Sequence, residues 1–244
     1  MRSLETVGLL LRWQYLRFRS WLPMMISIQV LLAVGVIYGM ALLVPDIDSR
    51  TALYLATGAP TLSLLILGLN VVPQEVAQAR LAGRHDYWRA LPVPRLAPLA
   101  AEVTFWLLLQ LPGTVLALVV AAIRFDVSFH IGWTVVPAIV LVALTGAAVG
   151  YGLASTLAPQ VTGQVTAFVS IVILLFSPIN FPADRLPGFM QVVHRVLPIQ
   201  YMADVMRGSL TGRYDDPAVL AFVVVGCWCI AGLGASYRAA VRRA

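Results

Sequence analysis

The feature that most constrains this chain is an uncharged stretch from Val127 to Ala183, which holds no Asp, Glu, Lys or Arg. One helix of that length would be roughly 85 Å long, whereas the hydrocarbon core of a bilayer is about 30 Å thick. The stretch must therefore cross a membrane and fold back. Ala158, Pro159 and Gln160 form the expected turn, because proline disfavours helix in the residue before it.

Further apolar runs of spanning length lie on both sides of this stretch. Charged residues make up 11% of the 244 residues, against about 25% in soluble domains, so lipid is the expected solvent. The sequence predicts an all-α integral membrane protein with one transmembrane domain over residues 21–237. Its six expected spans are Trp21–Val44, Thr51–Val72, Pro98–Ile123, Trp133–Leu157, Val161–Ile179 and Pro217–Tyr237, with Pro45 and Pro73 ending the first two.

Residues 1–20 are predicted to form an amphipathic helix along the membrane interface. Apolar residues recur at spacings of three and four, which places them on one helix face; they are Leu4, Val7, Leu11, Tyr15 and Phe18. Arginines on the other faces suit lipid phosphates. A plain solvated helix is the alternative.

Arginine placement predicts the orientation of the chain in the cell membrane. Residues 1–20, the loop 74–97 and the tail 238–244 together hold eleven of the 17 basic residues, and the opposite side holds six. Basic residues favour the cytoplasmic side. We expect both termini to be cytoplasmic.

Residues 178–216 are expected to form a short helical hairpin on the outer face, either re-entrant or interfacial. Four prolines divide this segment into pieces too short to cross, namely Pro178, Pro182, Pro187 and Pro198. The two expected pieces are Leu186–Leu197 and Ile199–Leu210. Each has an apolar side, with Leu186, Phe189, Met190 and Val193 on the first and Met202, Val205, Met206 and Leu210 on the second. The hairpin is expected to cap the outer end of a pathway.

Residue types argue against an enzyme on this chain. All 17 basic residues are arginine, and a Walker A loop needs a lysine for the nucleotide phosphates. The histidines stand far apart and outside any HExxH pattern, so no metal site is expected. The net charge of +6 comes from dispersed arginines, which favours anionic lipid rather than nucleic acid as the partner.

Few polar residues fall deep within the expected spans. Glu102 is the only charge well inside a span and lies near its start, with Arg95 or another loop arginine as its expected partner, which argues against ion-coupled transport. Four amides lie at depth: Asn70, Gln110, Gln164 and Asn180. They either line a weakly polar path or form hydrogen bonds between helices.

The loop 74–97 is predicted to contain a docking helix for a partner. Tyr87 and Trp88 stand beside Asp86 and Arg89, and aromatic residues and arginine are enriched at protein interfaces. Glycine pairs at Gly35 and Gly39, and at Gly146 and Gly150, predict close helix packing and permit a dimer.

The order of these features resembles the permease subunits of type-2 ATP-binding-cassette exporters. The resemblance extends over nearly the whole chain. It rests on the N-terminal helix before six spans, on Glu75, Gly83 and the Leu91-Pro92-Val93-Pro94-Arg95 ending of the loop, and most specifically on Phe176–Leu210, with its proline-containing turn and short helices. The loop departs from the family's Glu-Arg-x-x-Gly-Thr pattern, because it reads Glu75-Val76-Ala77-Gln78 and then Gly83-Arg84-His85.

This resemblance implies the following roles. Two permeases, identical or different, would pair around a path above two ATPase subunits, which would carry ATP and magnesium; this chain would need no cofactor. The coupling residues would be Glu75, Gly83, Arg84, Asp86, Tyr87, Trp88 and Arg89. The outer gate would lie near Phe176, Pro178, Asn180 and Phe181, and the substrate would be a drug-like, antibiotic or lipid-like amphiphile. A membrane assembly or regulatory protein and a self-contained carrier are the alternatives.

Overall fold

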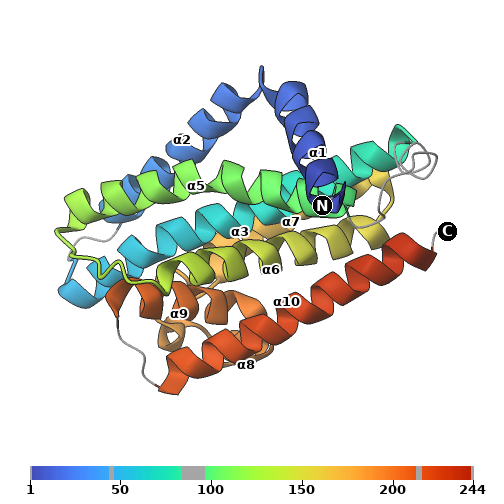
Figure 1. Cartoon of the computed structure of the whole chain (residues 1–244). Coiled ribbons are helices and arrows are strands. Elements are labelled where there is room, and N and C mark those ends of the chain that lie inside the picture. Colours follow the sequence, from blue (N-terminus) through green and yellow to red (C-terminus); the bar gives the residue numbers. More distant parts are fainter. Residues whose placement is uncertain (1, 44–46, 84–96, 213–215, 243–244) are drawn as a thin grey trace.

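The computed structural model describes residues 2–43, 47–83, 97–212 and 216–242, and all regular structure among them is helical (Figure 1). The long helices α2, α3, α5, α6, α7 and α10 are apolar enough to cross a membrane, which confirms the predicted fold class. The elements are α1 Arg2–Phe18, α2 Leu22–Leu43, α3 Ser49–Leu81, α5 Ala97–Phe125, α6 Val135–Thr156, α7 Pro159–Phe176, the 3-10 turn η1 Ala183–Arg185, α8 Gly188–Val196, α9 Pro198–Thr211 and α10 Asp216–Arg242.

The bundle has two distinct ends. The first, called here the α1 end, holds α1, the last turns of α3 and α10, and the turn between α6 and α7 (Figure 1). The other, called the hairpin end, holds α8, α9 and the start of α3. Segments expected on one side of the membrane therefore share one end of the bundle. The assignment of the α1 end to the cytoplasm stays a prediction.

Helix α3 is the centre of the bundle. It packs against α2, α5, α6, α7 and α9, and it is buried on all sides from Leu55 to Leu65. A helix that is apolar all round is expected at such a central position. Its leucines join α6 and α9 in the largest core cluster, which includes Val142 and Met206.

The prediction that Pro73 ends the second span is wrong, because α3 continues through Pro73 to Leu81. Gly150 of α6 explains why α3 can continue through this proline. Its missing side chain lets the Gly68 carbonyl and the Pro73 ring approach the α6 backbone. Proline persists within membrane helices where neighbouring protein covers the interrupted backbone. The helix is roughly 50 Å long at 1.5 Å per residue, so its last turns extend beyond a bilayer core.

The glycine pairs behave differently. Gly146 and Gly150 both contact α3, as the pattern predicted, whereas a side chain added at Gly35 or Gly39 of α2 would meet no atom within 4 Å. The α2 pair therefore makes no packing contact with the part of the chain that the structure describes.

Prolines shape the hairpin as predicted. Pro187 precedes α8, and Pro198 is the first residue of α9. The apolar side of α9 lies fully in the core, since Met202, Val205 and Met206 are all 0% exposed. The corresponding side of α8 does not, because Phe189 is 68% exposed. Helix α8 therefore lies on the surface and α9 within the protein.

Helix α10 continues to Arg242, so most of the expected tail 238–244 is helical. In α1, Phe18 stacks on Phe105 of α5 with ring centroids 5.5 Å apart, while Tyr15 is 54% exposed. The interfacial location of α1 stays a prediction.

We predict that Gly150→Ala destabilises the bundle. The added methyl group would collide with the Gly68 carbonyl and would lie 3.0 Å from the Pro73 ring, and overpacking of this kind costs about 1–3 kcal/mol. Unfolding by denaturing detergent should measure the loss. Gly152→Ala is the matched control on the same helix, because a methyl group there would meet no atom within 4 Å. Equal stability of both variants would contradict the proposed close crossing.

Candidate functional site

A partly buried polar cluster at the hairpin end adjoins the residues expected at the outer gate. Arg207 of α9 is its centre. The guanidinium donates from Nη1 to Oδ1 of Asp204 at 2.7 Å and from Nη2 to the Ile179 carbonyl at 3.1 Å. It also lies over the Tyr54 ring of α3, 3.8 Å from the ring centroid, which is a cation–π contact. Arg207 of α9 thus connects its own helix to α3 and to the turn after α7.

Burial shifts the ionisation of this pair. Burial lowers the pKa of Arg207, and Asp204 and Tyr54 oppose that shift. Burial likewise raises the pKa of Asp204, against the opposing effect of Arg207. The two charges stabilise each other where each alone would be costly.

The turn after α7 is held against α3 at Gly58. A side chain at this position would collide with the amide oxygen of Asn180 and the carbonyl of Ile179. Asn180 is 4% exposed, and its Oδ1 has no hydrogen-bond partner among the described residues. Pro178 is buried and Phe181 half-buried, whereas Phe176 is 45% exposed. The expected gate residues are therefore neighbours, with Phe176 on the outside.

His194 of α8 closes the other side of the same turn. Its Nε2 lies 3.1 Å from the Phe176 carbonyl, to which it must donate, and its Nδ1 has no partner among the described residues. Burial lowers the pKa of His194 below its usual 6.5, although the contact with Phe176 opposes the shift. The neutral ring is the form that suits the fold.

The amides expected along a path do not converge. Asn70 of α3 donates to the Ser170 hydroxyl of α7 at 2.6 Å, an interhelical hydrogen bond. Gln110 of α5 is 3% exposed in the interior, while Gln164 is exposed on α7. Each therefore faces a different part of the bundle, and their roles stay predictions.

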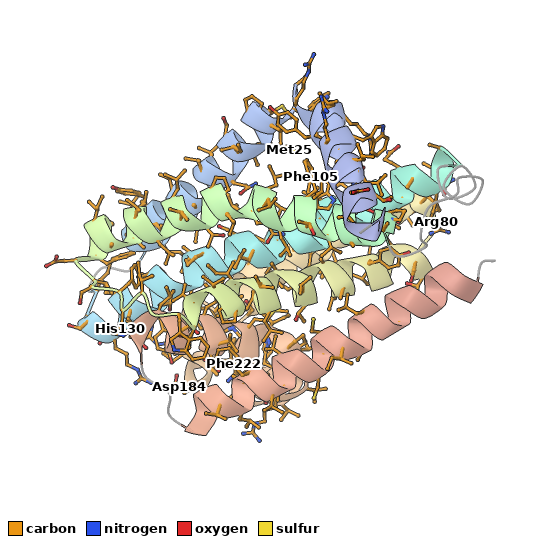
Figure 2. The ribbon with its side chains drawn as sticks, viewed as in Figure 1. Met25, Arg80, Phe105, His130, Asp184 and Phe222 are labelled. Carbon is orange, nitrogen blue, oxygen red and sulfur yellow. The ribbon has the colours of Figure 1, made fainter. Side chains whose placement is uncertain are left out.

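At the α1 end, polar contacts connect α3 to α1 and to the end of α6. Glu75 accepts from Arg17 of α1 at 3.1 Å. Arg80 donates from Nη1 to the Ala154 carbonyl at 2.7 Å and to the Leu157 carbonyl at 2.9 Å, at the end of α6 (Figure 2). An arginine at the carbonyl end of a helix is favoured by the helix dipole. Sequence reasoning missed the role of Arg80, because a basic residue in the last turn does not reveal its partner.

Gly83 follows α3 with φ of +61°. Glycine adopts this left-handed conformation without strain and commonly terminates helices. The other expected coupling residues, Arg84, Asp86, Tyr87, Trp88 and Arg89, lie outside the described residues.

We predict that Arg207→Gln destabilises the protein by about 2 kcal/mol, because it leaves a partly buried carboxylate without its charged partner. Adding Asp204→Asn to this variant should recover part of the loss. Denaturing-detergent titration provides the measurement, and Arg185→Gln is the control because Arg185 is an exposed arginine at the same end. Indistinguishable losses for the two arginine variants would contradict the role of Arg207.

We predict that stability falls on acidification through the range below pH 6.5. The folded pKa of His194 is lowered, so the unfolded chain binds the proton more readily and the stabilisation present above pH 6.5 is lost as pH falls through the folded pKa. The wild type and His194→Gln should be compared by thermal unfolding between pH 7.5 and 5. A variant as pH-sensitive as the wild type would show that another group is responsible.

Comparison with protein-family models identifies the family of this chain. The model described as ABC-2 type transporter matches residues 6–211, from within α1 to the end of α9. A search of curated proteins gave no match. The family match covers more than half of the chain and agrees with its six apolar helices. The chain therefore belongs to the ABC-2 type transporter family and is a multi-pass membrane component of an ABC transporter.

Proposed function

We propose that this chain is the permease subunit of an ATP-driven exporter that moves an amphiphilic substrate out of the cell. Its ATPase is a separate polypeptide that carries ATP and magnesium, and a second permease copy completes the path. The family match supports the transporter assignment. The absence of lysine supports separate ATPase subunits, because a nucleotide-binding P-loop requires one.

The small size of the cavity beside α3 is the observation that supports a second copy. Helix α3 occupies the centre, and a cavity beside it has a volume of about 40 Å³. Pockets for drug-sized molecules have volumes of about 300–1,000 Å³. A substrate of that size therefore requires a path along an outer face of the bundle, for which a second permease supplies the other wall.

Contacts at both ends of α3 support a mechanism of coupling. The ATPase would act on residues 84–90, directly after Gly83. Movement there would reach α1 through Glu75 and the turn between α6 and α7 through Arg80. At the hairpin end, Tyr54 and Gly58 of the same helix contact Arg207 and Asn180. Closure of the ATPase pair would thereby shift the population between inward- and outward-facing states.

Residues 84–90 are therefore predicted to bind the ATPase. Trp88→Ala or Asp86→Ala should reduce the ATPase that copurifies with the permease by at least about fivefold, because anchor residues dominate the energy of an interface. Co-expression with the ATPase encoded beside this gene, followed by affinity purification, measures the ratio. Trp133→Ala is the control, because Trp133 is 84% exposed and lies two residues before α6, at the opposite end of that helix from its turn to α7.

Two results would reject the proposed function. One is purification of the wild-type chain without the adjacent ATPase under conditions that preserve its fold. Alternatively, proteoliposomes holding the chain alone would transport substrate on a pH gradient without ATP, which would identify a self-contained carrier.

A further inference from the structure

Helix α5 contains a proline near its middle, at Pro112. Because proline has no backbone N–H, the Leu108 carbonyl loses its usual partner within the helix. Gly113 follows directly, and glycine has the most flexible backbone of all residues. At the next position, the Thr114 hydroxyl donates to the Gln110 carbonyl at 3.0 Å, a kind of bond that often bends helices. These three consecutive residues make this point of α5 easier to bend than the turns on either side.

The two halves of α5 belong to different core clusters. On the first half, Phe105 packs in one cluster with Phe18 of α1 and Val76 of α3. On the second half, Ala121 packs in another cluster with Ile37 of α2. Figure 1 shows the same division, with α1 across the start of α5 and the later turns of α2 beside its end. A bend between the two halves would therefore let each half keep its own neighbours.

The side chain of Gln29 on α2 bridges the point of bending. It is 6% exposed, and its Nε2 donates to the Leu109 carbonyl at 3.1 Å. A side chain added at Gly113 would collide with the Gln29 amide oxygen and would lie 2.8 Å from the Gln29 Cβ, so glycine is what permits this approach. One amide thus contacts α5 on both sides of Pro112.

The strength of this contact suits a latch that opens and closes. A hydrogen bond between helices in a membrane shifts an equilibrium by about threefold on average, so breaking one costs far less than separating two helices. Ala97 begins α5 fifteen residues before Pro112, which is roughly 22 Å along a helix. A bend of about 20° would therefore move the start of α5 by roughly 8 Å.

We propose that Pro112 and Gly113 form a hinge in α5 and that Gln29 is the latch that holds this hinge in the present conformation. Opening breaks the hydrogen bond from Gln29 to Leu109 and swings the first half of α5 relative to α6, while the second half stays packed on α2. In the proposed exporter, the ATPase would supply the force through the loop before Ala97. Only the source of this force rests on the proposed function, since the hinge is a property of the chain itself.

Distances between spin labels test the hinge without any ATPase. Cysteine is introduced in pairs at exposed positions, in a chain whose two native cysteines are replaced by alanine. Ala100→Cys with Thr156→Cys reports on the first half of α5 relative to the end of α6. Ile123→Cys with Val136→Cys reports on the second half relative to the start of α6. Labelled chain is reconstituted in nanodiscs with excess unlabelled chain, so that pulsed electron–electron double resonance measures distances within one chain.

Gln29→Met removes the latch and keeps a side chain of similar length. It should raise about threefold the fraction of chains at a second distance for the first pair, and leave the second pair unchanged. Pro112→Ala restores the backbone hydrogen bond to Leu108 and should remove this second distance, even in combination with Gln29→Met. Gln164→Met is the matched control, because it makes the same change on the exposed surface of α7.

The complex with the ATPase encoded beside this gene tests the source of the force. Trapping the complex with ATP and vanadate should shift the distance of the first pair in the wild type and leave it unshifted in Pro112→Ala, although that variant still copurifies with the ATPase. A chain that captures no ATPase would reject the proposed function, and the comparison of variants without ATPase would still decide the hinge.

Three results would overturn the proposal. One is a wild-type distance distribution in folded Gln29→Met, and another is an equal change at both label pairs, which would show that α5 moves as one rigid body. The third is a second distance that persists in Pro112→Ala. Size-exclusion elution and thermal unfolding verify that each variant is folded, and Pro112→Ala alone decides the question if the latch variant does not fold.

Discussion

The close crossing of α3 and α6 is the contact on which the rest of the bundle depends. Gly68 and Gly150 bring the two backbones together, and the same approach covers Pro73. Within a bilayer the hydrophobic effect does not drive helices together, so close van der Waals packing must do so. Because α3 also contacts α2, α5, α7 and α9, this crossing sets the position from which the other helices pack.

The long central helix also joins the two polar regions of the molecule. Tyr54 and Gly58 meet the hairpin near its start, and Glu75 and Arg80 contact α1 and the end of α6 near its finish. A rigid helix with contacts at both ends is a physical route for coupling two sites. In the proposed exporter, α3 would transmit movement of the loop after Gly83 to the outer turn.

Polar groups inside this bundle fall into two kinds. Asn70 and Gln29 have partners across helix interfaces, at Ser170 and the Leu109 carbonyl, and such bonds support packing. The indole Nε1 of Trp106 and the amide Oε1 of Gln110 instead have no hydrogen-bond partner among the described residues.

Hydropathy and proline positions in the sequence by themselves determined the six spans, the turn before Pro159 and the two short helices of the hairpin, and the family resemblance followed from their order. These features depend on local composition and on the length needed to cross lipid. Tertiary structure alone decided that α3 passes through Pro73 and that the apolar side of α8 faces outward. It also determined which groups accept hydrogen bonds from Arg80 and Arg207. The physical reason is that a helix apolar on every side carries no signal for its rotation or its neighbours, so these contacts arise only when the helices pack together.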